Sequence, residues 1–191
     1  FIIRFNICFF STSLNLNIMI NRLLSLLYLL FCKVLFCINH RWYMKMYIPY
    51  LKWRGTRIHG TPRYIGVHVK FDNYHLIEIG NNTTISDDCH LLTHDYSITN
   101  VMRAIGIEFS KDIALVRDIR IGNNVFIGKK SIIMPNARIG NNCIIGAGSV
   151  IRGIVPDNTV FGGNPAQCFS SVEELAKKWM IYIENNQIRK D

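Results

Sequence analysis

The segment Thr93–Ile98, with the sequence THDYSI, carries the side chains best suited to acid–base chemistry in this chain. Its histidine, His94, has an imidazole, a group that titrates near neutral pH and can take the proton of an attacking hydroxyl. Asp95, a loop residue such as Glu108, or a backbone carbonyl could orient the imidazole. A direct bond from Asp95 is not expected, because adjacent strand residues point to opposite faces. An isolated histidine of this kind is ordinarily a surface residue in a turn, so its role depends on the surrounding elements.

Metal and thiol chemistry are both disfavoured by the positions of the histidines and cysteines. Zinc needs three or four ligands, and beside His90 and His94 the evident third histidine is the distant His75. No metal is therefore expected. The six cysteines form no C-x-x-C pair, so no disulfide framework is expected either. Cys89 and Cys143 fall at inward positions of the repeat described next, where a thiol behaves as a small hydrophobe rather than a nucleophile.

A six-residue repeat surrounds the polar segment. Aliphatic residues return every six positions at Leu115, Ile121, Ile127, Ile133, Ile139, Ile145 and Ile151. Small or aliphatic residues stand four places later, at Ile119, Val125, Ser131, Ala137, Cys143, Ser149 and Val155. Earlier in the chain, the same positions of the six-residue repeat are occupied by Val67, Ile79, Ile85 and Leu91. A period of six fits neither a helix nor a simple strand, and it is the period of a β-helix whose stacked coils share one apolar column.

Glycine and asparagine mark the corners of these coils. Glycine follows the aliphatic residue at Gly122, Gly128, Gly140 and Gly146, where a tight turn benefits from the missing Cβ. The pairs Asn123–Asn124 and Asn141–Asn142 suit left-handed corner positions. A Gly- and Asn-rich antiparallel meander is the alternative, but it would not keep a six-residue phase for so long. Between about residues 97 and 114 the period fails and is then recovered, which predicts an extruded loop of the kind that carries function in solenoids.

The motifs IGNNVFIG at 121–128, IGNNCIIGAGSV at 139–150 and GGNPAQ at 162–167 resemble those of the hexapeptide-repeat acyltransferases, in particular the maltose, galactoside and polysaccharide O-acetyltransferases. The resemblance implies an all-β fold, a left-handed parallel β-helix of hexapeptide repeats, and a homotrimer. The β-helix is expected over residues 57–169, with an amphipathic helical segment before it and a C-terminal helix after it.

The resemblance also assigns roles to individual residues. His94 matches the catalytic histidine of a THD-type motif, which implies a general base. Acetyl-CoA is implied as co-substrate, lying between neighbouring β-helices. The residues expected to contact it are Phe126, Lys129, Lys130, Gly146, Ala147, Gly148, Arg152, Asn164 and Pro165. Phe126 stands where related enzymes often have tryptophan, and Ile154 where they often have a charged residue, so acceptor and CoA details are not expected to transfer closely.

The activity that this resemblance implies is transfer of an acetyl group from acetyl-CoA to a saccharide hydroxyl during surface polysaccharide synthesis. The acceptor would be a saccharide or a nucleotide- or lipid-linked sugar. Two alternatives stay open: N-acetylation of an amino sugar, and a non-catalytic β-helix that serves as a scaffold. The expected location is the cytoplasm, with peripheral contact at the inner face of the plasma membrane.

The net charge of +9 is concentrated in the N-terminal third. Residues 1–71 hold ten of the twenty-two Lys and Arg and none of the thirteen Asp and Glu. Residues 1–18 are interpreted as a leader that is not native, with Met19 as the start, or as part of a truncated longer protein. In residues 19–56, the apolar run Leu23–Ile38 is interrupted by Lys33 and falls short of the roughly 20 residues of a membrane span.

Basic and aromatic side chains flank that run, so residues 19–57 are predicted to lie at a membrane interface. Packing on the β-helix end or in the trimer, a true span and a signal peptide are the alternatives, although no A-x-A cleavage site follows. Nucleic acid is not an expected partner, because the basic residues alternate with long aliphatic ones.

Residues 170–191 change to a helical period. Ser170 with Glu173, and Ser171 with Glu174, each match a capping box. The apolar face that follows is expected to cap the last coil, with Trp179 in the core. A charged tail, Arg189–Asp191, ends the chain.

Overall fold

The computed structural model describes residues 2–189, and their side chains from Ile18 onward. The chain divides into two compact units, one ending at Tyr50 and one beginning at Leu51. Phe1, the first residue of the predicted leader, and Lys190 and Asp191 of the predicted tail lie outside the described residues.

The first unit is a helical hairpin. Helix α1 (Ile2–Ile38) is followed after one residue by α2 (His40–Trp53). Asn39 begins α2, because its Oδ1 accepts hydrogen bonds from the backbone N–H groups of Arg41 at 2.9 Å and Trp42 at 3.2 Å. Within α1, the 21 residues Ile18–Ile38 are long and apolar enough to cross a membrane. The apolar stretch is thus longer than the predicted run from Leu23, because the helix continues without a break through residue 18.

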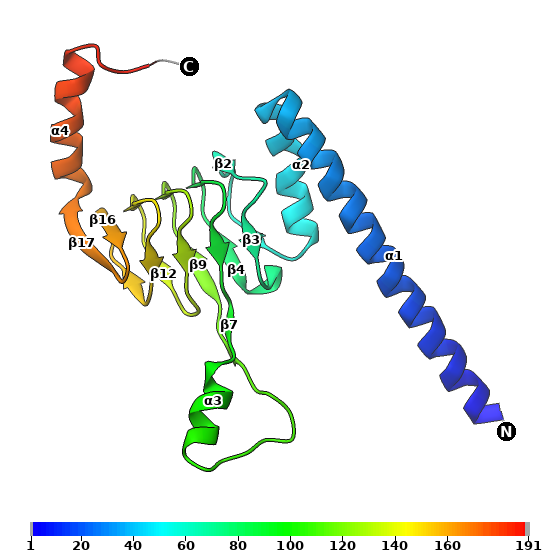
Figure 1. Ribbon diagram of the computed structural model, residues 1–191. Helices are drawn as coiled ribbons and strands as arrows, with labels where there is room; N and C mark the ends of the chain where they lie inside the picture. Colours follow the sequence, from blue (N-terminus) through cyan, green and yellow to red (C-terminus); the bar gives the residue numbers. More distant parts are fainter. Residues whose placement is uncertain (1, 190–191) are drawn as a thin grey trace. The chain divides into compact units, whose positions relative to one another are not determined.

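The second unit is a stack of coils whose sides are three parallel sheets (Figure 1). One sheet contains β1 (Arg57–Ile58), β4 (Ile77–Ile79), β9 (Ile119–Ile121), β12 (Arg138–Ile139) and β15 (Ile154–Val155). The next contains β2 (Tyr64–Ile65), β5 (Thr84–Ile85), β10 (Phe126–Ile127), β13 (Ile144–Ile145), β16 (Thr159–Gly163) and the antiparallel β17 (Ala166–Ser171). The third contains β3 (Lys70–Phe71), β6 (His90–Leu91), β11 (Ile132–Ile133) and β14 (Val150–Ile151). A short 3₁₀ helix, η1 (Tyr74–Leu76), precedes β4.

The predicted repeat residues form the core of this stack. The aliphatic positions from Ile121 to Ile151 and the small positions from Ile119 to Val155 are all buried. Leu115 is an exception: it is 38% exposed and pairs with Asp95, so its predicted inward position is wrong. Val67 is buried, but the strand residue in register with Ile85 is Ile65. Paired residues of the first and second coils are therefore 20 positions apart on this sheet, not the 18 that three six-residue repeats give. The predicted assignment of Val67 to the same position as Ile85 is wrong.

The loop predicted at about 97–114 leaves the stack through a two-stranded ribbon. Strands β7 (His94–Asp95) and β8 (Leu115–Val116) pair antiparallel at its base. The loop contains helix α3 (Ser97–Ala104) and extends away from the coils (Figure 1). Its two arms are joined by the buried Thr99, whose hydroxyl donates to the Ile113 carbonyl at 2.8 Å and accepts from the Ile113 N–H at 2.9 Å. In the structure this segment leaves the coils and contains its own helix.

The corner asparagines form hydrogen bonds from coil to coil. The Oδ1 of Asn123 accepts from the backbone N–H of Asn81 at 2.8 Å, and the Oδ1 of Asn141 accepts from the N–H of Asn123 at 2.9 Å. The following residues, Asn124 and Asn142, have φ values of 53° and 54°, which asparagine tolerates. Each corner therefore has its turn donors satisfied by the next coil.

Two repeat glycines provide a matched test of close coil packing. A Cβ on Gly122 would lie 2.6 Å from the carbonyl oxygen of Gly140, which belongs to backbone and cannot move aside. A Cβ on Gly146 would find nothing nearer than 3.6 Å. We expect Gly122→Ala to lower the free energy of unfolding by about 1–3 kcal/mol through overpacking, and Gly146→Ala to leave it nearly unchanged. Urea titration of both variants checks this, and equal effects would contradict it.

The C-terminal helix α4 (Val172–Glu184) begins where the capping box predicts. Ser171 Oγ accepts from the Glu174 N–H at 3.1 Å, and Glu174 Oε2 accepts from the Ser171 N–H at 3.3 Å. The prediction that its apolar face caps the last coil is wrong, because none of its residues is buried and Trp179 is 53% exposed. The hairpin of β16 and β17 separates the helix from the end of the coils (Figure 1).

Candidate active site

The predicted base, His94, is held by a carboxylate that the sequence analysis did not identify. His94 Nδ1 lies 3.0 Å from Asp72 Oδ2, and the Asp72 side chain is only 15% exposed. The same oxygen accepts the backbone N–H of Thr93 at 3.2 Å, which fixes the carboxylate beneath the start of the ribbon. An ionised carboxylate only accepts hydrogen bonds, so this contact favours the tautomer of His94 that carries its proton on Nδ1. Nε2 is then the ring nitrogen with a lone pair available to take a proton.

Two further rings surround this pair. His90 Nε2 lies 3.4 Å from Asp72 Oδ1, so two histidines share one carboxylate. The ring of Tyr96 stands edge to face with His94, with the ring centroids 5.4 Å apart. The His94 side chain remains 40% exposed. The imidazole is therefore oriented on one side and accessible to a substrate on the other.

The orienting residues proposed from the sequence do not hold His94. Asp95 instead accepts from the backbone N–H of Ser97 at 2.9 Å. Hydrogen bonds from the Ser97 backbone and hydroxyl lower the pKa of Asp95, and the charge of Arg152 adds a smaller effect. Glu108 is exposed in the loop, and among the described residues it makes no bond to His94. Asp72 takes the role because it directly follows β3, which pairs with β6, the strand that precedes His94.

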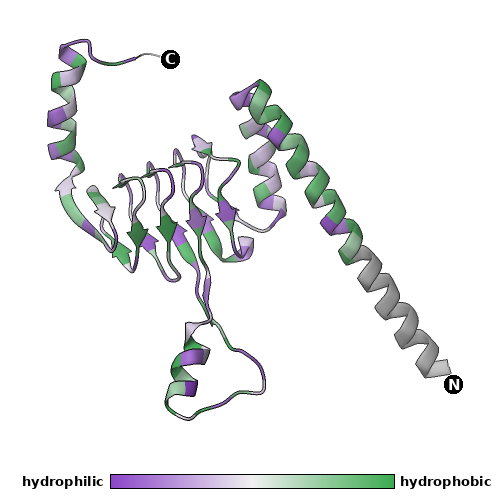
Figure 2. Cartoon of the chain, in the orientation of Figure 1, coloured by the Kyte–Doolittle hydropathy of each residue, from purple (hydrophilic) through white to green (hydrophobic). Residues whose placement is uncertain are grey.

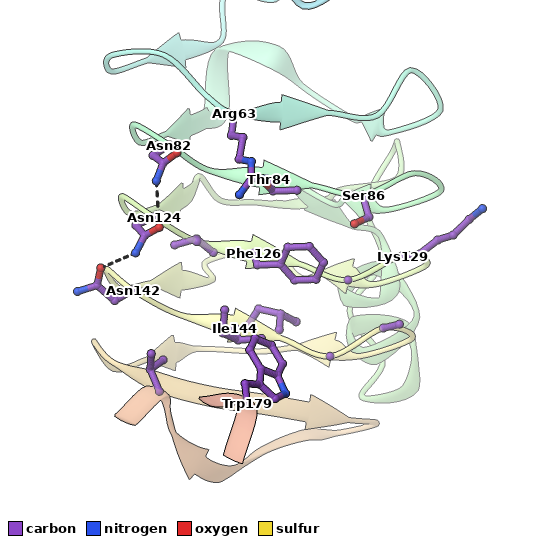
Figure 3. Close-up of a pocket in the computed structure, with 16 residues that line it drawn as sticks. Arg63, Asn82, Thr84, Ser86, Asn124, Phe126, Lys129, Asn142, Ile144 and Trp179 are labelled. Carbon is purple, nitrogen blue, oxygen red and sulfur yellow. Dashed lines mark hydrogen bonds between the residues drawn. The ribbon is translucent and has the colours of Figure 1, made fainter. Parts of the chain in front are cut away.

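A groove of about 620 Å³ runs along the outer face of the sheet that contains β5, β10 and β13 (Figure 3). Phe126, 43% exposed, lies in its centre, and Trp179 of α4 lies beside Ile144 at one end. One long edge is the hydrogen-bonded row Asn82, Asn124 and Asn142, with side-chain bonds of 3.1 and 2.9 Å. The volume of the groove falls within the usual range of small-molecule sites, about 300–1,000 Å³.

Four of the predicted cofactor-binding residues line this groove: Phe126, Lys129, Gly146 and Ala147. Lys129 Nζ lies 3.6 Å from Asp88 Oδ2, and the Lys129 side chain is 58% exposed. The backbone of the other two forms the corner after β13. A groove with aromatic rings, amide groups and a cation at its rim can accept a long, partly apolar ligand with an anionic end.

The remaining predicted cofactor-binding residues do not line the groove. Lys130 and Gly148 occupy corner positions with φ values of 62° and 70°. Asn164 and Pro165 are exposed in the turn between β16 and β17, where their peptide bond is cis. Arg152 is close enough for its charge to act on Asp95. Arg152 therefore belongs with the ribbon of His94 rather than with the groove.

Groove residues that the sequence analysis missed come from three places. Arg63, Thr84 and Ser86 come from the coils before the strict repeat, the asparagine row comes from the corners, and Val172 and Trp179 come from α4. The six-residue period could have placed Thr84 beside Phe126, since the two are in register. No sequence signal brings Trp179 to this face.

His94 is not among the residues that line the groove. His94 lies in the ribbon of β7 and β8, which follows β6 of the sheet that contains β3, β11 and β14. The groove covers a different sheet, the one that contains β5, β10 and β13. Within one chain, the predicted base and the four predicted cofactor residues that line the groove therefore occupy separate parts of the coil stack.

The structure also places the cysteines and the candidate metal ligands. Cys89 and Cys143 are fully buried as predicted, and burial raises the pKa of both thiols, which disfavours the nucleophilic thiolate. Among the side chains described, those of residues 18–189, no group of three or more His, Cys, Asp or Glu is placed to hold a metal ion. His75 packs against Gly55, where an added Cβ would lie 2.2 Å from its Nδ1.

Comparisons with known proteins find similarity to hexapeptide-repeat proteins in both sequence and fold. Residues 118–153 match the family described as bacterial transferase hexapeptide (six repeats). The chain superposes on a galactoside acetyltransferase in complex with coenzyme A with a TM-score of 0.55 and 22% identity, covering 82% of each chain. A maltose O-acetyltransferase from Clostridium difficile 630 gives a TM-score of 0.52 and 22% identity, covering 78% of this chain and 88% of that one. The predicted resemblance in repeat and fold is confirmed.

Two relatives found by sequence have higher identity to this chain than these structures do. Protein CapG of Staphylococcus aureus is 45% identical over 104 residues, which is 54% of this chain and 58% of CapG. A putative acetyltransferase of Schizosaccharomyces pombe, C18B11.09c, is 32% identical over 62% of this chain and 55% of the relative. The chain therefore spans just over half the length of these relatives.

Proposed function

We propose that the protein transfers an acetyl group from acetyl-CoA to a hydroxyl of a saccharide, with His94 as general base, in the assembly of a surface polysaccharide. The observation that carries the proposal is the His94–Asp72 pair, which leaves Nε2 of an accessible imidazole as proton acceptor. The name of the Schizosaccharomyces pombe relative, a putative acetyltransferase, supports the reaction class. The acceptor sugar would be free, nucleotide-linked or lipid-linked.

The groove supports binding of the donor. A pantetheine arm would lie over Phe126 and along the backbone of Gly146 and Ala147, while Lys129 would meet a phosphate as a point charge. Backbone N–H groups would stabilise the oxyanion of the thioester carbonyl as the hydroxyl attacks, a contribution of about 2.7–4 kcal/mol per donor where it has been measured. The acetyl group would move in one step from sulfur to oxygen, with the hydroxyl proton passing to His94.

We also propose a left-handed coil and a homotrimer. In a cyclic trimer, the groove of one chain can face His94 of the next, which would unite the donor site and the base at the interface. The separation of His94 from the groove within one chain favours this arrangement. A chain that acts at the cytoplasmic side of the plasma membrane would meet both acetyl-CoA and nucleotide- or lipid-linked sugars.

Acetyl-CoA binding is the first test. At about a hundred times its Kd, acetyl-CoA should stabilise the folded chain by about 2.7 kcal/mol and raise the Tm by several degrees, as followed by differential scanning fluorimetry. Lys129→Glu should reduce this shift, whereas the control Lys111→Glu, an equal charge change on the extruded loop, should not. An unchanged Tm at millimolar acetyl-CoA would contradict the acetyltransferase proposal.

A further inference from the structure

The helical hairpin of the first unit buries hydroxyl groups between its two helices. Its packed face carries hydroxyl groups: Ser25 is 7% exposed, and its Oγ lies 3.0 Å from the hydroxyl of Tyr50. The hydroxyl of Tyr28 donates to the carbonyl of Met46 at 3.1 Å, and its ring stacks on Tyr50 with centroids 5.3 Å apart. The polar groups between the two helices are therefore satisfied inside the hairpin.

The exposed face of α1, by contrast, is aliphatic. Leu23, Leu27, Leu30 and Val34 recur at helical spacing on the side away from Ser25, and each is between 51% and 59% exposed. Only 11% of the apolar stretch is buried. Figure 2 shows the described part of α1 as predominantly hydrophobic. An apolar surface of this extent marks a site of membrane or protein contact.

Charge identifies which of these contacts the hairpin fits. Residues 18–50 contain Arg22, Lys33, Arg41 and Lys45, all exposed, and no Asp or Glu. Trp42, near the start of α2, is 57% exposed. Basic side chains and an exposed indole beside an aliphatic helix match the interface of an anionic bilayer, where phosphates meet acyl chains. A protein partner would need a matching acidic and apolar surface together.

We infer that the hairpin binds the surface of an anionic lipid bilayer, with α1 embedded lengthwise at the boundary between headgroups and acyl chains. An orientation across the bilayer would place Lys33 within the apolar stretch and carry Lys45 of the neighbouring helix below the headgroups, at a high cost. Lying in the plane, these side chains reach the phosphates while the internal hydroxyl bonds stay satisfied. This inference is independent of the proposed transferase activity.

Vesicle partitioning tests the charge contribution. The full chain should bind phosphatidylcholine vesicles that contain phosphatidylglycerol much more tightly than pure phosphatidylcholine vesicles. Arg41→Glu with Lys45→Glu should lower the partition coefficient on anionic vesicles at least about thirty-fold. The control pair Lys111→Glu and Lys178→Glu changes the net charge equally, outside the hairpin, and should have little effect. Equal losses in both pairs, or no binding at all, would overturn the inference.

The aliphatic face has its own matched control. Leu27→Asp with Leu30→Asp, at 55% and 59% exposure, should lower partitioning by about a hundredfold or more. Ile154→Asp with Ile181→Asp, at 75% and 57% exposure in the second unit, should leave it nearly unchanged. Both side chains of each pair are exposed, so circular dichroism should show intact folding. Unaltered lipid binding by the Leu27 and Leu30 variant would contradict the claim that this face of α1 is embedded in the bilayer.

Depth measurements separate the in-plane arrangement from a span. A single tryptophan is introduced as Leu23→Trp, Leu30→Trp or Val34→Trp, in a chain whose Trp42, Trp53 and Trp179 are replaced by phenylalanine. Quenching by lipids brominated at different depths should place all three probes at the same shallow level. Depths that change progressively along α1 would show a spanning helix and overturn the in-plane arrangement.

Discussion

Replacing His94 by alanine is expected to lower the rate of acetyl transfer by about 10²–10⁴-fold, the usual contribution of a general base. A saccharide hydroxyl is a weak nucleophile, and without the imidazole its proton has no acceptor as the bond to the thioester carbon forms. Because His94 is not part of the groove, binding of acetyl-CoA should persist. The measurement is release of free CoA in the presence of saccharide acceptors, combined with the thermal shift given by acetyl-CoA alone.

His68 is the matched control for this substitution. Its Nδ1 lies 3.7 Å from Asp87 Oδ1, so it is also a histidine beside an aspartate on a coil corner, with a side chain 58% exposed. His68→Ala should transfer acetyl groups at nearly the native rate. An unchanged rate in His94→Ala, or an equal fall in both variants, would exclude His94 as the base. Loss of the acetyl-CoA shift in His94→Ala would instead show that the histidine contributes to donor binding.

The solenoid could be predicted from sequence because every coil repeats the same physical requirement. Each inward position must be aliphatic or small to fit the shared column, so a period of six persists from Ile121 to Ile151 and needs no knowledge of distant contacts. The same reasoning failed at Leu115, which continues the period by residue type. It lies in the ribbon at the base of the loop, where pairing with Asp95 replaces stacking on a coil.

Asp72 could not be found in this way, because the period does not hold where Asp72 lies. The register of the first coil is Phe71 with Leu91, an offset of 20 residues. Asp72 thereby falls beside Leu92, between His90 and His94, and reaches both imidazoles.

Trp179 shows a different limit of prediction from sequence. Helical spacing predicts an apolar face on α4, but it does not predict which part of the protein that face contacts. The structure places Trp179 at the end of the groove and leaves it half exposed.

Asp72→Asn is expected to lower kcat by on the order of 10²-fold, while KM for acetyl-CoA changes little. The amide keeps the size of the carboxylate, and with its oxygen in the place of Oδ2 it would accept from the Thr93 N–H as before. In the opposite rotamer the NH₂ group takes that place and donates to Nδ1 of His94 instead of accepting from Thr93, so the ring proton moves to Nε2 and the proton acceptor is lost. The corresponding change in Ser-His-Asp triads lowers kcat by about 10⁴ while the geometry is kept.

A control at Asp87 separates positioning from fold stability. Asp87 also lies beside a histidine and also accepts a backbone N–H, from His68 at 3.4 Å, but it has no bond to His94. Asp87→Asn should therefore leave kcat close to native even if its Tm falls as much as that of Asp72→Asn. Asp72→Glu should recover part of the lost kcat, since a carboxylate on a longer side chain can still accept from Nδ1. An equal fall in kcat for the two asparagine variants would show that Asp72 supports the fold rather than orients the base.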